Sequence, residues 1–289
     1  MKILYISKFD LPDFMNDMVF HGLRSLLGEE VVDLNEAWYM YDDFQKYWAD
    51  RVPGRGMEYG RGFTLYGRLP KLNIDRTDIE SKIKHNYFDK IIFGSIRRYD
   101  HGLWERNILY RYPDKRIVLI DGEDDQNIIQ DFQRLGAYYK RELVRDDVVG
   151  VFPINFCIPK ESIVKEIPKK EKDYATIIPG NKSTYIYTEE KPYYEDYQKS
   201  HFGVTCKKGG WDCLRHYEIL MNGCIPWFPN LEECPEYTMA SFPKKLVLGA
   251  MSKIKEQNDL SFYEEYVNLL LEHTRKHLTT EEVAKSVIS

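Results

Sequence analysis

Ser200-His-Phe-Gly-Val-Thr-Cys-Lys-Lys-Gly-Gly-Trp-Asp-Cys-Leu-Arg-His-Tyr-Glu-Ile-Leu-Met-Asn-Gly-Cys-Ile-Pro-Trp-Phe228 is the stretch of sequence that decides the fold. It predicts a strand over Phe202–Cys206, a basic glycine turn over Lys207–Gly210, a helix over Trp211–Asn222 and a second strand over Cys224–Phe228. A helix between two strands is typical of a parallel sheet, because parallel neighbours need a crossover connection. The stretch therefore favours an α/β fold.

The turn and the helix after it have the composition of an anion site. The amino end of a helix presents unpaired N–H groups and the positive end of its dipole. Gly209 and Gly210 would let the backbone approach a diphosphate closely, and Lys208 would add positive charge. Helical spacing places Arg215 and Glu218 on one polar face, where one can meet a phosphate and the other two ribose hydroxyls. A surface ion pair worth about 0.2–0.5 kcal/mol is the alternative, and spacing alone slightly favours it.

The sequence before this stretch also alternates strands and helices. Short runs rich in β-branched and apolar residues predict strands, and Asn16–Leu27 predicts a helix that Gly28 ends. A further helix is expected over His101–Tyr110. The predicted strands are Lys2–Ile6, Val31–Leu34, Tyr87–Ser95 and Arg116–Gly122. This order predicts a parallel sheet that helices cover on both faces.

A connector rich in Pro, Lys and Glu lies near residues 155–173, and a new strand is expected over Asp173–Pro179. Helices over residues 251–257 and 261–277 and a short helical tail close the chain. We therefore expect two Rossmann-like domains, residues 1–165 and 166–289, with a cleft between them and terminal helices on the second. Ligands of such sheets bind at the carboxyl ends of the strands.

Composition narrows the class of protein. The chain has 289 residues, enough for two compact domains, and a net charge of −5, which argues against nucleic acid as a partner. It has no run of about 20 apolar residues that could span a membrane, and the apolar start over Met1–Ser7 resembles a strand more than a signal peptide. A cytoplasmic protein is expected. Five cysteines without a C-x-x-C pair favour reduced core thiols over a metal site.

Around the deciding stretch, the chain resembles the donor-binding domain of GT-B glycosyltransferases. It is most similar to the exostosin-like branch and to related "family 1" transferases of bacteria and viruses. The residues that carry the resemblance are Ser200, Phe202, Gly203, Gly209, Gly210, Arg215, Glu218, Leu220, Gly223, Cys224, Ile225 and Pro226. The resemblance implies that Glu218 holds the donor ribose and that Lys208, Gly209, Gly210 and Arg215 face the diphosphate. It also places Lys182, in the first loop of the second domain, near the leaving phosphate.

The implied activity is transfer of a sugar from a UDP- or GDP-class nucleotide sugar to a glycan or another hydroxyl acceptor. No metal and no cofactor is expected, because the chain lacks a clear D-x-D motif near a strand end. Two alternatives remain open. One is a nucleotide-sugar-binding protein without turnover, and the other is a transferase that places sugars on nucleic-acid bases. Only the Gly/Arg-rich stretch over residues 53–70, with Arg55, Arg61 and Arg68, favours the second alternative.

Several residues are candidates for the acceptor's base. Asp121 and Glu123 follow a predicted strand and should lie at the cleft edge, although a solvated acidic turn would have the same sequence. Asp17 and His21 stand at i and i+4 on the first helix, where a carboxylate could orient an imidazole. A surface histidine with a nearby carboxylate is the more common arrangement. Arg141 is a candidate to neutralise the diphosphate, or to form a structural ion pair.

Overall fold

The computed structural model describes residues 1–10, 12–51, 65–98, 108, 111–257 and 260–289. Within this part of the chain, six strands form a wholly parallel sheet in the order β2-β1-β3-β4-β5-β6. Its strands are β1 Ile3–Ile6, β2 Val31–Asp33, β3 Lys90–Phe93, β4 Ile117–Asp121, β5 Ala137–Lys140 and β6 Val151–Pro153. The central strands are almost continuous apolar runs because both faces of the sheet are covered. The predicted parallel α/β architecture is confirmed for this half of the chain.

The helices of this half include α1, whose carboxyl end follows from local sequence. The α1 helix spans Phe14–Leu27 and ends at Gly28, which has a φ of 55°. Glycine adopts this left-handed conformation without a side-chain clash, so it stops the helix as predicted. The shorter helices of this half are α2 Gln45–Arg51, α3 Ile79–Lys84 and α5 Gln130–Gln133.

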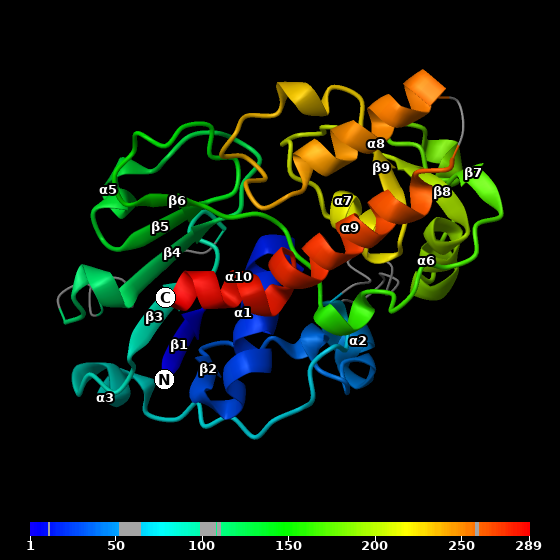
Figure 1. Ribbon diagram of the computed structural model, residues 1–289. Helices are drawn as coiled ribbons and strands as arrows, with labels where there is room; N and C mark the ends of the chain where they lie inside the picture. The colour runs from blue at the N-terminus through cyan, green and yellow to red at the C-terminus, as the bar shows by residue number, and fades with distance from the viewer. Residues whose placement is uncertain (11, 52–64, 99–107, 109–110, 258–259) are drawn as a thin grey trace.

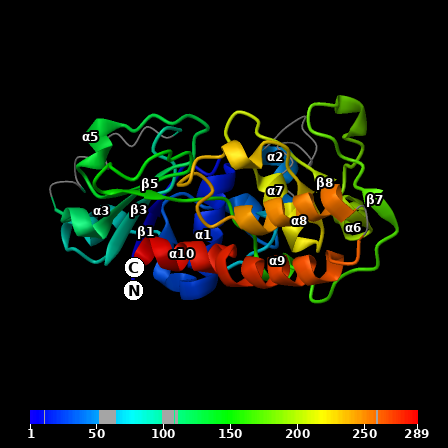
Figure 2. The ribbon, with the colours of Figure 1, turned by 45° about the horizontal axis from the view of Figure 1, so that its top comes forward.

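A second parallel sheet contains three strands among the described residues, in the order β7-β8-β9. These strands are β7 Lys172–Tyr174, β8 Ser200–Val204 and β9 Ile225–Trp227, and the helices around them are α6 Glu190–Gln198, α7 Leu214–Met221, α8 Lys244–Gln257 and α9 Tyr263–His277. The two views in Figure 1 and Figure 2 place this sheet and the first sheet at opposite sides of the molecule. The deciding stretch therefore forms the β8-α7-β9 unit of the second sheet.

The last helix, α10 Thr280–Ile288, returns to the first sheet and packs against α1 (Figures 1 and 2). The two helices touch at backbone level: a Cβ atom built on Gly22 would lie 1.9 Å from the carbonyl oxygen of Thr280. Only glycine permits this approach at position 22. The last helix, which the sequence assigns to the second domain, thus packs against a helix of the first. The domain boundary expected between residues 165 and 166 stays a prediction.

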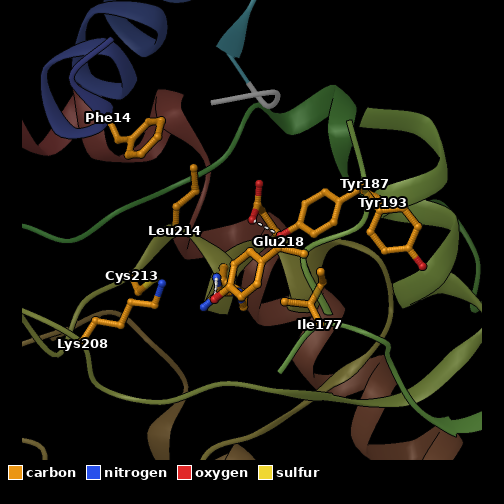
Figure 3. Close-up of a pocket in the computed structure, with 10 residues that line it drawn as sticks. Phe14, Ile177, Tyr187, Tyr193, Lys208, Cys213, Leu214 and Glu218 are labelled. Carbon is orange, nitrogen blue, oxygen red and sulfur yellow. Dashed lines mark hydrogen bonds between the residues drawn. The ribbon is translucent and has the colours of Figure 1, made fainter. Parts of the chain in front are cut away.

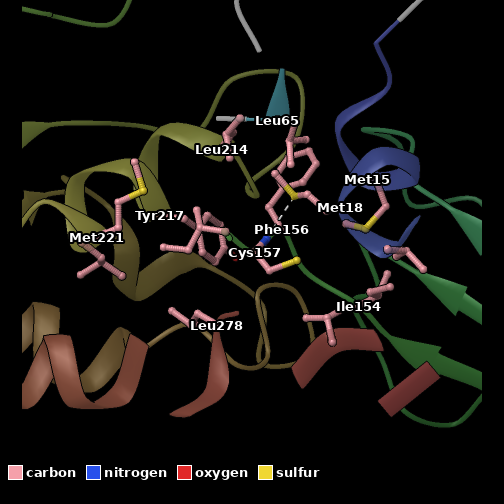
Figure 4. Close-up of a cluster of buried hydrophobic side chains, with 14 of the residues drawn as sticks. Met15, Met18, Leu65, Ile154, Phe156, Cys157, Leu214, Tyr217, Met221 and Leu278 are labelled. Atoms are coloured by element: carbon pink, nitrogen blue, oxygen red, sulfur yellow. Dashed lines mark hydrogen bonds between the residues drawn. The ribbon is translucent and has the colours of Figure 1, made fainter. Parts of the chain in front are cut away.

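One continuous hydrophobic cluster joins the two sheets. The segment between them supplies Phe156 and Cys157, which lie among side chains of α1 and α7 (Figure 4). The same segment pairs with the chain before α10, because Ile158 N–H donates to Leu278 O at 3.0 Å and Thr280 N–H donates to Ile158 O at 2.9 Å. Burial of apolar side chains in this shared cluster favours packing of the two halves against each other.

Several element ends differ from the sequence-based expectations. The α7 helix begins at Leu214 and not at Trp211, β7 ends at Tyr174, and α8 begins at Lys244. The short strands β5 and β6 were not predicted. The expected helix over His101–Tyr110 lies almost wholly outside the described residues, as do Arg55 and Arg61.

Candidate functional site

A cavity of about 240 Å³ lies at the amino end of α7, beside the segments that follow β7 and β8. Figure 3 shows Lys208 and Cys213 on one side of it, Tyr187 and Tyr193 on the other, and Glu218 between them. The remaining lining residues are Phe14, Ile177, Tyr185, Leu214 and Arg215. Phe14 belongs to α1, so both halves of the chain contribute to this cavity.

Arg215 is a buried cation in this cavity whose hydrogen-bonding capacity is mostly unused. Its side chain is 9% exposed, and Nη2 donates to the Tyr185 hydroxyl at 3.3 Å. Within the described residues, Nε and Nη1 have no hydrogen-bond partner. A guanidinium carries its charge at every physiological pH, and burying an unpaired charge is costly. The arrangement is therefore suited to an anion that enters the cavity and accepts from the guanidinium.

Glu218 lies one helical turn after Arg215 and is 4% exposed. Its Oε2 accepts from the Tyr193 hydroxyl at 2.6 Å. Burial, and then the negative charge of Glu218, raises the pKa of Tyr193 well above its ordinary value, so the tyrosine stays a donor. All eight residues of α7 are buried. The alternative that Arg215 and Glu218 form a surface ion pair is therefore wrong.

A second cavity of about 610 Å³ adjoins the first, since Tyr185 and Lys208 line both. Lys182, Lys207 and Cys206 belong to its wall. Lys182 begins a single 3-10 turn after β7, as expected for a residue in the first loop of the second half. Three lysines and Arg215 thus line these two neighbouring cavities, in which Glu218 is the one carboxylate among the described lining residues. The excess of positive charge again favours an anionic ligand.

The two glycines of the turn, Gly209 and Gly210, line neither cavity. They face carboxylates of the first-sheet half: a Cβ on Gly209 would lie 2.3 Å from Asp124 Oδ2, and one on Gly210 would lie 2.3 Å from Glu142 Oε1. The N–H groups that follow the turn, those of Trp211 and Asp212, both donate to Glu142 at 3.0 Å. The Glu142 carboxylate thus accepts the hydrogen bonds of both backbone N–H groups that follow this turn.

Arg141 belongs to the same junction. Its guanidinium donates to the carbonyl oxygens of Gly122 at 2.8 Å and Asp212 at 2.6 Å, and it pairs with Glu142 and Asp124. The side chain is 2% exposed. Of the two roles expected for Arg141, the structural ion pair is the one that these contacts describe.

Arginine and lysine side chains pair with the acidic residues at the end of β4 and in the turn after it. Asp121 is fully buried and accepts from Arg97 Nε at 2.9 Å, Lys140 Nζ at 3.1 Å and the Tyr138 hydroxyl at 2.5 Å. Burial lowers the pKa of Lys140, against the opposing effect of Asp121. Glu123 pairs with Arg98 at 2.5 Å. Neither acid lines the cavities around Arg215.

Asp17 and His21, the other expected pair, have separate partners. Asp17 is fully buried and accepts from the Tyr39 hydroxyl at 2.6 Å. His21 Nδ1 lies 2.9 Å from Thr280 Oγ1, and burial lowers the pKa of this histidine to about 4. His21 is therefore neutral near pH 7, and it contributes to the contact between α1 and α10.

The sequence interpretation missed the aromatic wall of the cavity. Tyr185, Tyr187 and Tyr193 lie within nine residues of one another, and this local density was the available signal. It was discounted because tyrosine is frequent throughout the chain, with 22 residues in all. Phe14 could not be assigned from sequence, since it reaches the cavity from the other half.

Three further findings bear on the kind of protein and site. No helix in the described part of the chain combines the length and apolar character needed to cross a bilayer. Across those same residues, no three His, Cys, Asp or Glu side chains gather in a group that could hold a metal ion. No protein-family model, no curated protein and no solved structure matches this chain.

Proposed function

We propose that this protein is a nucleotide-sugar-dependent glycosyltransferase with a GT-B arrangement of two lobes, related to exostosin-like and "family 1" transferases. The observation that carries the proposal is the buried Arg215 guanidinium, which lacks partners at two nitrogens and lies one helical turn from Glu218 in a lined cavity. The diphosphate of a UDP- or GDP-class donor would provide hydrogen-bond acceptors for these two nitrogens. We place the protein in the cytoplasm.

In the proposed complex, the diphosphate accepts hydrogen bonds from Arg215 and Lys208, and Lys182 approaches it from the adjoining cavity. These cations stabilise the charge that develops as the diphosphate leaves, so no bound metal is needed. Glu218 accepts from the ribose hydroxyls, and the tyrosine wall stacks on the base. The glycan or other hydroxyl acceptor binds from the first-sheet half, which also supplies Phe14 to the cavity.

The test is turnover and binding with a panel of UDP- and GDP-sugars. The wild-type protein should release UDP or GDP from one donor class, and Glu218→Gln should weaken binding of that nucleotide roughly 10- to 100-fold, because hydrogen bonds to a charged group contribute about 1.5–3 kcal/mol. The matched control is Glu264→Gln on the exposed side of α9, which should bind like wild type.

The outcomes separate the candidate functions. Nucleotide binding without release from any donor would favour the non-catalytic binding protein. Binding that is unchanged in Glu218→Gln would remove Glu218 from the site. A salt-dependent shift of duplex DNA would favour transfer to nucleic-acid bases instead.

A further inference from the structure

Two pairs of side chains join the helices α6 and α7. Gln198 Nε2 donates to Asn222 Oδ1 at 2.8 Å, where both helices end. About one turn earlier in each helix, the Tyr193 hydroxyl donates to Glu218 Oε2 at 2.6 Å (Figure 3). Tyr193 and Glu218 line the cavity around Arg215, whereas Gln198 and Asn222 do not. The first pair therefore only connects the helices, and the second also acts on the candidate site.

Two partners fix the direction of the Tyr193 hydroxyl. Tyr197, one helical turn further along α6, is fully buried and donates its hydroxyl to the Tyr193 oxygen at 3.4 Å. The two rings meet edge to face, with centroids 5.1 Å apart. A phenol has a single O–H donor, and Tyr193 gives this donor to Glu218. The hydroxyl of Tyr193 therefore acts on a ligand through the Glu218 carboxylate.

Arg215 and Glu218 stand at i and i+3 of one helix, a spacing at which opposite charges commonly pair. Both side chains are buried, and their attraction is stronger there than in water. Arg215 Nε and Nη1 nevertheless have no hydrogen-bond partner among the described residues, and Nη2 donates to the Tyr185 hydroxyl. A neutral hydroxyl from α6, not the guanidinium, is the donor to Glu218 Oε2. The two charges of the cavity are thus kept from hydrogen-bonding each other.

Resting on the proposed transferase function, we infer that Tyr193 is a positioning residue that keeps the Glu218 carboxylate from pairing with Arg215. Its hydroxyl holds the carboxylate toward α6, so the guanidinium can serve the diphosphate while the carboxylate serves the ribose. A direct pair between Arg215 and Glu218 would withdraw both groups from the donor. Tyr193 therefore sets two properties of the site: its affinity for a diphosphate, and its preference for a ribonucleotide over the 2′-deoxy form.

The first experiment is a double-mutant cycle on the full chain, read by binding of inorganic pyrophosphate, which has no ribose. Tyr193→Phe keeps the ring and its contact with Tyr197 but removes the hydroxyl. Glu218 should then turn to Arg215, and pyrophosphate affinity should fall roughly tenfold. In the Glu218→Gln background the same change should alter affinity by less than about twofold, because no carboxylate remains to pair with Arg215. A purely structural effect would weaken binding in both backgrounds.

The second experiment compares UDP and GDP with their 2′-deoxy forms. Wild type should prefer the ribonucleotide that it binds over the 2′-deoxy form by roughly tenfold, and Tyr193→Phe should reduce this preference to about twofold or less. Gln198→Met is the matched control, because it removes the other pair between α6 and α7 and leaves the hydrogen bond between Tyr193 and Glu218 in place. This control should keep the wild-type preference even where it lowers stability.

A crystal structure of ligand-free Tyr193→Phe gives a readout that needs no nucleotide. One Glu218 carboxylate oxygen should lie about 3 Å from a guanidinium nitrogen of Arg215. An unmoved Glu218, an equal loss of pyrophosphate affinity in both backgrounds, or an unchanged preference for the ribonucleotide would overturn the role of Tyr193 and leave the proposed function standing. Wild-type protein that binds neither UDP nor GDP would overturn the proposed function itself, and the ligand-free structure would still decide whether Tyr193 separates the two charges.

Discussion

The Glu142 carboxylate, two residues past the end of β5, accepts the backbone N–H of Asp212 at 3.0 Å. One side chain of the first-sheet half thereby fixes the turn that leads into α7 of the second. The residue that follows Asp212, Cys213, is extended (φ −144°, ψ 133°) and is the N-cap of α7, so the helix begins at Leu214. Under the proposed function, side chains, with Arg215 foremost, would hold the diphosphate of the donor.

Replacing Glu142 should destabilise the protein strongly. In Glu142→Ala, two buried N–H groups lose their acceptor and Arg141 loses a buried partner, which should lower the free energy of unfolding by about 3–5 kcal/mol. Urea denaturation measures this change. Glu166→Ala, at an exposed position, should stay within about 0.5 kcal/mol of wild type. Equal stability of Glu142→Ala and wild type would contradict the junction as described.

The stability contributed by His216 should depend on pH. His216 is fully buried between Thr205 Oγ1 at 2.8 Å and Trp211 O at 2.9 Å, and burial lowers its pKa to about 3. The unfolded state binds a proton near the ordinary pKa of about 6.5. The contribution is therefore complete above that pH and falls as pH drops toward 3, by up to about 1.4 kcal/mol per pH unit.

The measurement compares chemical denaturation of wild type and His216→Gln between pH 4 and pH 8. The difference in unfolding free energy should be constant at the alkaline end and should shrink on acidification. Other titrating groups are common to both proteins, so their contributions cancel. A difference that does not change with pH would mean that His216 is not held neutral by burial.

The contact between α1 and α10 depends on Gly22. Gly22→Ala would place a Cβ atom 1.9 Å from the Thr280 carbonyl oxygen, and overpacking of this kind costs about 1–3 kcal/mol. Thermal unfolding should report the loss. Gly249→Ala in α8 is the matched control, because its Cβ would meet only the end of the Tyr266 side chain at 3.2 Å. Helix propensity favours alanine there by about 1 kcal/mol, so this variant should be neutral or more stable.

Local patterns in the sequence predicted the parallel α/β architecture and one part of the candidate site. Apolar runs located β1, β3 and β4, and Gly28 located the end of α1, because those signals act within a few residues. Helical spacing brought Arg215 and Glu218 together for the same reason.

The features of the fold and of the site that the sequence did not predict depend on contacts between distant segments. Glu142 lies 70 residues from Asp212, and no local pattern signals that its carboxylate will take the Asp212 amide. The buried state of Asp17 and His21 likewise follows from the return of α10 to α1.

Arg215→Met should leave the ligand-free protein at least as stable as wild type. Methionine fills a similar volume without a charge, and an apolar replacement of a poorly compensated buried charge is often neutral or stabilising. Denaturation of the ligand-free variant measures this. A loss of several kcal/mol would mean that the guanidinium serves the fold and not a ligand.

The most direct test of the account is titration of UDP and of GDP into wild type, Arg215→Met and the exposed control Arg134→Met. Wild type and the control should bind one nucleotide equally well, and Arg215→Met should bind it roughly 10- to 100-fold more weakly, as expected for loss of about 1.5–3 kcal/mol of charged hydrogen bonds. Wild-type protein that binds neither nucleotide, or an Arg215→Met variant that binds as tightly as wild type, would contradict the central claim.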